Sequence, residues 1–443
     1  MFKFLIKNNY TKIATLILTV LILLYCVYII NYSKIINDWS LVELLINYQG
    51  GFVRRGLFGE LNLFFEKSLK FPNLLFSIFI ISFFYFVNIF ITFLRLLKFN
   101  NTNNFFLFFL IFLSPATFLF YIYDLGALFR KDVFIIFSII IHCFYVQLYY
   151  KKSNFISNYK KKLFIIIFIL CSITLIHEAQ FFMLPFHILL SYSILRNVKL
   201  TLLYFSFPVI FFLITWIFDG NYLVAQGVRE SLAHYPGNII YQDYNPINSL
   251  EGNLNLVMGS FFKFFFRYTY IQTIELLIAV FLSIILFWNI LSIYFDQFFL
   301  ENKSLYSINL KFFNDNNYKF FFISFFLFFF MGFDAGRAIH ILLMHIISVY
   351  LIFIPKKNPS IFLLKNNKYK YFLFFFLFCY ISSWTLHHGY IGISGTIFKS
   401  GFFFNLKVIF SYIVEFSSDI ILFPIFLVDF SKEYLIFNSL VKF

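Results

Sequence analysis

The sequence predicts an all-α, polytopic integral membrane protein with about 12 transmembrane helices. Of its 443 residues, 61% are hydrophobic and only 12% are charged, which is far from the composition of a soluble globular chain. Apolar runs long enough to cross about 30 Å of hydrocarbon as a helix recur along the whole length. Lysine-rich clusters fall in every second connection between these runs, as the positive-inside rule requires of an alternating chain.

The spans follow from apolar runs bounded by polar or basic residues. The first run follows Lys3, Lys7 and Lys12 and lacks a small-residue cleavage site, so we expect a retained span and a cytoplasmic N-terminus. In the last span, Glu415 and Asp419 would lie one turn apart in lipid, so an interfacial helix followed by a shorter span is the alternative. The predicted spans lie near residues 12–30, 71–94, 105–123, 133–150, 163–176, 179–195, 200–218, 271–295, 319–333, 338–354, 370–386 and 407–430.

Lysine and arginine separate across this predicted topology. With the Lys-rich connections inside, 20 of the 27 lysines are cytoplasmic, whereas only two of the eight arginines, Arg95 and Arg196, are. The positive-inside rule disfavours outer arginines, so a bound anion is the favoured explanation, because a planar guanidinium holds phosphate or carboxylate with two hydrogen bonds. The outer arginines are Arg54, Arg55, Arg130, Arg229, Arg267 and Arg337.

Composition and motifs exclude several classes of function. The net charge of +15 resides largely in short connections, where lysines orient the chain and contact anionic lipid headgroups, so no nucleic-acid partner is expected. The chain has no P-loop, GxGxxG, GxSxG or paired CxxC motif, and the HEAQF segment lacks the second His of a zinc protease helix. We expect no cofactor and no metal site, with a divalent metal left open as an alternative.

The first outer connection, 31–70, contains the sharpest local motif, GGFVRRGLFG from Gly50 to Gly59. Glycines around Arg54 and Arg55 permit close backbone approach and offer free N–H groups beside two guanidiniums, which suits an anion. The alternative is an interfacial amphipathic helix anchored by Arg55. The same connection also contains the carboxylates Asp38, Glu43 and Glu60.

Two further outer connections place charges near a span end. Arg130 and Lys131, in the connection 124–132, precede a helix N-terminus, which disfavours cations unless an anion is bound there; an Arg–Asp pair within this segment is the alternative. His177 and Glu178 form a tight turn between two spans. Burial there is expected to raise the pKa of Glu178 toward that of a general base.

The remaining outer connections supply a second ion pair and an aromatic loop. Asp334 and Arg337 lie three residues apart on one predicted helix face, either as an internal pair or as ligands. The loop 219–270 offers Tyr241 and Tyr244 beside amides and a carboxylate, which suits stacking on a sugar ring; an interfacial aromatic belt is the alternative. The connection 386–406 completes the outer side of a single membrane domain, 1–443.

A pocket with several arginines, a few carboxylates and tyrosines fits an anionic, partly hydrophobic, sugar-bearing substrate such as a polyprenyl-phosphate or diphosphate-linked saccharide. The segments NYQGGFVRRGLFGE, LFRKD, LIHE and GFDAGR resemble bacterial membrane proteins linked with surface polysaccharides, and more broadly glycosyltransferases of the GT-C type and Wzy-like polymerases. The resemblance implies glycosyl transfer at the outer face of the bacterial cytoplasmic membrane. The GT-C resemblance implies a catalytic acid in the first outer loop, where Asp38, Glu43 and Glu60 are the candidates, and the Wzy-like resemblance implies a role for outer-loop arginines. The chain departs from the GT-C pattern in having no DxD or paired Asp-Glu in the first loop.

Two alternative functions stay open at this point. A flippase or exporter of the same lipid-linked anion should carry polar residues along both halves of its bundle and an internal repeat, and the sequence shows neither. An acyl- or phosphoethanolamine-type transferase lacks a nucleophile or metal motif. Among catalytic groups, the sequence does not choose between Glu178, His177, Asp38 and Glu43, nor does it fix the donor, the acceptor or the oligomeric state.

Overall fold

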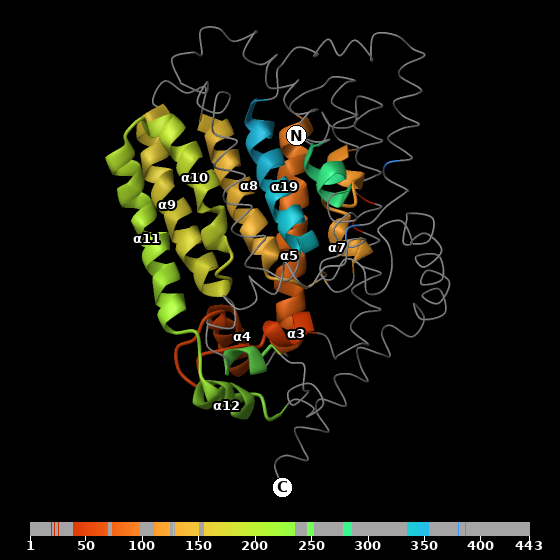
Figure 1. The fold of residues 1–443 in the computed structure, drawn as a ribbon, viewed down its shortest axis with the longest axis vertical. Coiled ribbons are helices and arrows are strands. Elements are labelled where there is room, and N and C mark those ends of the chain that lie inside the picture. Colours follow the sequence, from red (N-terminus) through yellow and green to blue (C-terminus); the bar gives the residue numbers. More distant parts are fainter. Residues whose placement is uncertain are drawn as a thin grey trace.

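The computed structural model describes residues 39–69, 73–97, 110–124, 127, 129–149, 155–234, 246–251, 278–285 and 335–353, with Thr19, Ile22, Tyr25, Tyr380 and Leu386. All regular structure in these residues is helical (Figure 1). Several predicted features therefore lie outside the described part: most of spans 12–30, 271–295, 319–333, 370–386 and 407–430, and the candidate site residues Asp38, Tyr241, Tyr244 and Asp334.

Six long helices form the main bundle. Five of them start within three residues of a predicted span, because each is a long apolar run bounded by polar residues. The sixth, α9, begins at Phe155 and so takes Lys160, Lys161 and Lys162 into its first turns instead of leaving them in a connection. The bundle helices are α5 (Asn73–Leu97), α8 (Asp132–Tyr149), α9 (Phe155–Ile176), α10 (Gln180–Leu195), α11 (Val198–Ile217) and α19 (Ala335–Tyr350).

The bundle has two groups of neighbours in Figure 1. Helices α9, α10 and α11 lie side by side on one flank, and α8 joins them to α5 and α19. Both α10 and α11 contain an internal proline, Pro185 and Pro208, a feature that membrane helices tolerate better than soluble ones. The short elements α7 (Phe120–Tyr123), η3 (Phe281–Ile285) and η5 (Leu351–Phe353) complete the described bundle.

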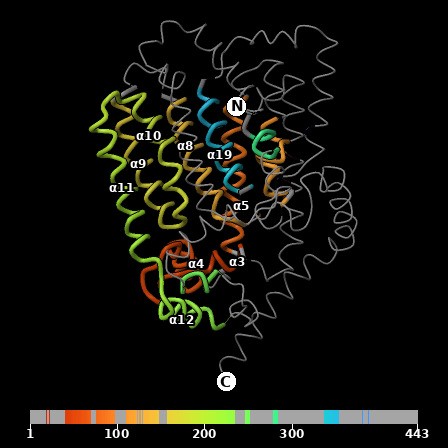
Figure 2. Tube along the Cα trace, in the orientation of Figure 1, coloured from red at the N-terminus to blue at the C-terminus, as the bar shows by residue number. Residues whose placement is uncertain are grey.

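Short helices cover one end of the bundle, where Figures 1 and 2 show α3, α4 and α12 together. They are α3 (Trp39–Glu43), α4 (Gly56–Leu69), α12 (Tyr222–Ser231) and the 3₁₀ turn η2 (Asn248–Leu250). Their apolar faces form a small core of their own, in which Val53, Val228 and Ile247 are fully buried. This end layer is formed by the described parts, 39–69, 219–234 and 246–251, of the connections that were predicted as 31–70 and 219–270.

Close backbone packing holds the end layer together. A Cβ at Gly59 of α4 would overlap the carbonyl of Ile46, and one at Gly227 of α12 would overlap the Cα of Gly50. Gly50 and Gly59 of the GGFVRRGLFG motif thus allow close backbone contact between segments of the same chain. The last residues of the motif, from Gly56 onward, form the start of α4, so the helical alternative holds for that part of the segment. Arg54 and Arg55 precede the helix.

The outward faces of α9 and α11 are strongly apolar. Phe164, Phe168, Leu203 and Leu213 each expose more than half of their surface. Among the described residues, two helical segments are long and apolar enough to cross a membrane, Phe76–Leu96 of α5 and Val198–Ile217 of α11; this test uses length and composition only. Helix α9 is long enough but carries three lysines near its start.

Candidate functional site

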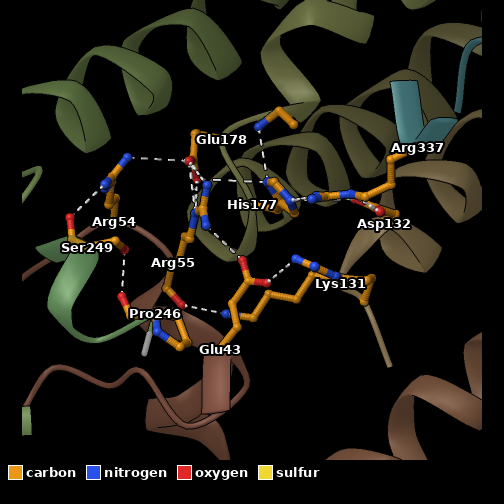
Figure 3. A network of polar contacts seen from close by, with 12 residues as sticks. Glu43, Arg54, Arg55, Lys131, Asp132, His177, Glu178, Pro246, Ser249 and Arg337 are labelled. Atoms are coloured by element: carbon orange, nitrogen blue, oxygen red, sulfur yellow. Dashed lines mark hydrogen bonds and ion pairs between the residues drawn. The ribbon is translucent and has the colours of Figure 1, made fainter. Parts of the chain in front are cut away.

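The end of the bundle that faces the short helices holds a cluster of charged side chains from distant parts of the chain. Five segments supply it: α3, the loop before α4, the connection before α8, the turn between α9 and α10, and the start of α19 (Figure 3). We call this group the ion cluster. Its members are Glu43, Arg54, Arg55, Arg130, Lys131, Asp132, His177, Glu178 and Arg337.

Arg55 lies at the centre of the ion cluster and bridges two carboxylates. Its Nε donates to both carboxylate oxygens of Glu178, at 2.8 and 2.9 Å, and its Nη1 donates to Glu43 at 2.8 Å. The backbone of Arg55 has φ +65°, in the left-handed region that residues with a side chain rarely occupy. Such a conformation costs about 1–3 kcal/mol and persists only where the surroundings enforce it, here by ion pairs across 123 residues of sequence.

A second pair joins the start of α19 to the start of α8. Arg337 donates through Nε and Nη2 to the two oxygens of Asp132, and its Nη2 lies 2.6 Å from Nε2 of His177. Asp132 is the first residue of α8, where the helix dipole favours a carboxylate. The Arg337–Asp132 pair joins two helices that are 205 residues apart in the sequence, while the predicted partner Asp334 lies outside the described residues.

Arg130 and Lys131 precede the same helix, and the structure supplies the anion that their position requires. Nη1 of Arg130 lies 3.4 Å from a carboxylate oxygen of Glu43, which is itself 1% exposed. Nζ of Lys131 donates to the backbone carbonyl of Arg55 at 3.0 Å. Glu43 is thus the internal counter-ion of Arg55 and Arg130, and it holds α3 against the bundle.

The charge state of the carboxylates differs from the sequence-based expectation. Burial alone would raise the pKa of Glu178, but the guanidinium of Arg55, which is also hydrogen-bonded to it, holds that pKa well below its usual value. Burial likewise opposes ionisation of Glu43, and Arg55, Arg130 and Lys131 together lower its pKa. The predicted upward shift of Glu178 was wrong because it considered burial without the charge that accompanies it.

Two further members of the ion cluster, His177 and Lys131, have lowered pKa values, which favour their neutral forms. Burial, with the nearby guanidinium of Arg55, lowers the pKa of His177 to about 4, so its imidazole is neutral at neutral pH. Burial lowers the pKa of Lys131 to about 8, partly offset by the attraction of Glu43. Lys131 therefore changes charge close to physiological pH.

Two cations have weaker carboxylate contacts than the others. Arg54 donates from Nη2 to the Ser249 carbonyl at 3.1 Å, lies 3.7 Å from Glu178 through Nη1, and has a buried Nε with no hydrogen bond in the described residues. Lys131 is fully buried and hydrogen-bonds to a neutral carbonyl. Arg55 and Arg337, in contrast, each hold a carboxylate with two donors.

Exposure distinguishes the three carboxylates of the ion cluster. The side chain of Glu178 is 18% exposed, whereas those of Glu43 and Asp132 are 1% and 0% exposed. Only Glu178 among these three has a surface that another molecule could reach.

In the part of the chain that the structure describes, no group of three or more His, Cys, Asp or Glu side chains has the arrangement of a metal site.

The structure brings together eight of the predicted site residues that lie in the described ranges. They are Glu43, Arg54, Arg55, Arg130, Lys131, His177, Glu178 and Arg337. It adds Asp132 as the partner of Arg337, a role for which the sequence held one signal, an acidic residue in the first turn of a helix. It also shows α12 inside the predicted loop, capped by the side chain of Asn221, which accepts from Val224 N at 2.9 Å.

Arg229 takes no part in the ion cluster. It lies in the last turn of α12 and pairs with Glu251 and with the side chain of Asn248. Arg229 therefore ties α12 to η2 and to the residue that follows it.

Comparison of the whole chain with family models, with curated proteins and with solved structures gives no match.

Proposed function

We propose that the protein is a membrane glycosyltransferase or polysaccharide polymerase that acts on polyprenyl-phosphate or diphosphate-linked sugars. The observation that supports this most is the ion cluster itself, in which Arg54 and Lys131 have no hydrogen bond to a carboxylate among the described residues, whereas Arg55 and Arg337 are held by carboxylates. In a buried setting, cations without a close carboxylate favour binding of a charged group such as phosphate.

In the proposed reaction, Arg54 and Lys131 bind the phosphate leaving group. The acceptor hydroxyl attacks the anomeric carbon, the bond from that carbon to the phosphate oxygen breaks, and the phosphate departs with the bonding electrons. Negative charge grows on the phosphate in an oxocarbenium-like transition state, where Arg54 and Lys131 stabilise it. The hydrophobic polyprenyl chain would remain in the lipid.

Glu178 is the proposed acceptor of the hydroxyl proton, because it is the carboxylate of the ion cluster that has exposed surface. The lowered pKa keeps it ionised, and its contacts with Arg55 fix its orientation. Glu43 and Asp132 are positioning residues that hold Arg55 and Arg337. Tyr241, Tyr244, Asp38 and Asp334 belong to the same proposal on sequence grounds alone.

The proposal includes a membrane-spanning chain of about 12 helices with the ion cluster at the outer face. The apolar outward surfaces of α9 and α11 support contact with lipid. The lysines at the start of α9 lie at the opposite end of that helix from His177 and Glu178, as the positive-inside rule requires. The proposed location is the bacterial cytoplasmic membrane.

The test uses the purified full chain in vesicles with a polyprenyl-diphosphate-linked saccharide. Thin-layer chromatography should show release of polyprenyl diphosphate and a longer lipid-linked glycan, and Glu178→Gln should lose most of this product. A strain that lacks the gene should accumulate the shorter lipid-linked precursor. Unchanged lipid-linked glycans in that strain, together with no transfer in vesicles, would contradict the proposal.

An exporter of the same lipid-linked saccharide is the second candidate, and one observation favours it. A transporter needs polar groups along the interior of its bundle. The structure buries Arg95 of α5, His142 of α8, Tyr159 of α9 and His187 of α10 between the helices, and none of these four belongs to the ion cluster. Movement of a fluorescent lipid-linked sugar across vesicles without chemical change would favour this candidate.

A further inference from the structure

A second polar network lies inside the bundle, apart from the ion cluster. Four hydrogen bonds in series join five side chains of α8, α9 and α10, and we call this series the histidine chain. Its bonds run from Ser138 Oγ to His187 Nε2 at 3.2 Å, from His187 Nδ1 to His142 Nδ1 at 2.9 Å, from His142 Nε2 to Tyr159 Oη at 2.7 Å, and from Tyr159 Oη to Ser191 Oγ at 2.8 Å.

Every atom of the histidine chain can serve as a donor or as an acceptor. A neutral imidazole has one N–H and one bare nitrogen, and a hydroxyl donates once and accepts. If Ser138 donates to His187, each following bond points toward Ser191; if Ser191 donates to Tyr159, each bond points toward Ser138. Both directions satisfy the four bonds of the series and differ by the shift of one proton along each bond. Ser138 Oγ also donates to the Ile135 carbonyl at 2.7 Å, which corresponds to the direction in which Ser191 donates to Tyr159 and His187 donates to Ser138.

Two other buried histidines, His340 and His345, have a fixed tautomer, as expected of histidines with a structural role only. His345 lies 2.8 Å through Nδ1 from the carbonyl of Ile341, and His340 lies 2.9 Å through Nδ1 from the carbonyl of Ala116. A carbonyl only accepts, so each Nδ1 carries the hydrogen and the tautomer is fixed. Nε2 of both residues has no hydrogen bond in the described residues.

The histidine chain runs along the bundle. At one end Ser138 Oγ also lies 3.2 Å from Oε1 of Gln180, the first residue of α10, which follows the turn that holds His177 and Glu178. At the other end Tyr159 neighbours the exposed Lys160 in sequence. From Gln180 to Ser191, α10 rises about 16 Å at ~1.5 Å per residue, roughly half of a ~30 Å hydrocarbon core.

All five side chains of the series are buried, with at most 1% of their surface exposed. The other titratable groups packed against it are His345, whose ring centroid lies 6.2 Å from that of His187, and Cys143 of α8 beside Tyr159. None of the four bonds of the series involves a carboxylate or a lysine. Buried ionisable groups inside membrane helices are costly and commonly mark proton relays.

We propose that the histidine chain is a proton path through the bundle, between the Tyr159 end and the end of the bundle that holds the ion cluster. A proton that arrives at Ser191 or Tyr159 shifts each proton of the series by one bond, and one proton leaves from Ser138. No electrons move, and the path resets when the hydroxyls and imidazoles turn back. This inference rests on the proposed membrane placement but not on glycosyl transfer.

Proton flux into vesicles tests the path directly. The full chain is reconstituted in vesicles that enclose a pH-sensitive dye, and a potassium gradient with valinomycin makes the interior negative. Wild-type protein should give inward proton flux several-fold above that of empty vesicles. His187→Gln and His142→Gln should reduce it to the empty-vesicle level, because an amide keeps a donor and an acceptor but does not relay a proton.

Matched variants separate conduction from folding. His340→Gln changes another buried histidine outside the histidine chain and should keep the flux. Tyr159→Phe removes a single hydroxyl, so it should abolish the flux even where a histidine variant fails to fold; size-exclusion profiles and unfolding midpoints identify such failures. Wild-type flux at the empty-vesicle level, or full flux in folded Tyr159→Phe, would overturn the proposal. Glycan assays on the same samples keep this outcome separate from that of the proposed transferase.

Discussion

Arg55 and Glu178 lie 123 residues apart in sequence, yet the guanidinium of one holds both carboxylate oxygens of the other. The pair joins the loop before α4 to the turn between α9 and α10, and so fixes the end layer on the bundle (Figure 3). Arg55 adopts a left-handed backbone at this point, which indicates that the pair stabilises a locally unfavourable conformation.

The first prediction concerns this pair. Arg55→Lys and Glu178→Gln should each destabilise the protein, and the two changes should not add, because both disrupt the same bidentate pair: an ammonium cannot reproduce the guanidinium fork, and the Gln amide carries no charge. A double-mutant cycle on the free energy of unfolding in detergent should give a coupling of about 3 kcal/mol. Additive effects would show that the two residues do not stabilise each other.

The second prediction separates phosphate binding from topology. Arg54→Lys keeps the charge but cannot reproduce the planar fork, so transfer to the acceptor should fall by tenfold or more, with protein level and orientation unchanged. Arg196→Lys is the matched control, because Arg196 is exposed at the end of α10. Full activity of Arg54→Lys would remove Arg54 from the site.

Arg95 is unsuitable as such a control, although it lies on the predicted inner side. It is fully buried, donates from Nε to Gln147 at 3.1 Å and also bonds the carbonyl of Ser348, so Arg95→Lys would disturb packing between α5, α8 and α19.

The third prediction uses the pKa of Lys131, which burial lowers to about 8. Below that pH the amine is charged and binds the phosphate; as the pH rises through about 8 the charge is lost, so the rate should decline on the alkaline side. Lys131→Arg should move this decline to higher pH, because a guanidinium stays protonated. The pH–rate profile is the measurement, with Lys160→Arg as the exposed control. An alkaline decline that is the same in Lys131→Arg would contradict the assignment.

The fourth prediction concerns stability in acid. Burial lowers the pKa of His177 from 6.5 to about 4, so between these values the unfolded chain binds the proton more readily than the folded one. Stability should therefore fall as the pH drops from 6.5 to 4, by about 2–3 kcal/mol from this residue. Unfolding midpoints of wild type and His177→Gln at pH 7, 5.5 and 4.5 test this. An equal acid loss in both proteins would assign the effect to other groups.

The fifth prediction fixes the orientation. A reporter fused after Lys161 should be cytoplasmic, and one near Asn238 should be external, because Lys-rich connections stay inside. These two positions fall on opposite sides of the proposed membrane. A cytoplasmic reporter at Asn238 would place the ion cluster on the inner side and remove the basis of the outer-face proposal.

The sequence by itself determined the helical fold class and the approximate bounds of most bundle helices. Long apolar runs of helical length with polar ends predict helices, and this information is local in the sequence. It also drew attention to Arg54, Arg55, Arg130, Glu178 and Arg337. Those residues stood out because a charge next to a long apolar run needs a partner.

Only the tertiary structure decided which charges are partners. Arg337 pairs with Asp132 across 205 residues, and Glu43 meets both Arg55 and Arg130, pairings that no local spacing predicts. The pKa of Glu178 depended on the same fact, since burial raises and an adjacent guanidinium lowers it. The histidine chain was likewise invisible in sequence, because His142, Tyr159 and His187 occupy three helices and align only when α8, α9 and α10 pack together.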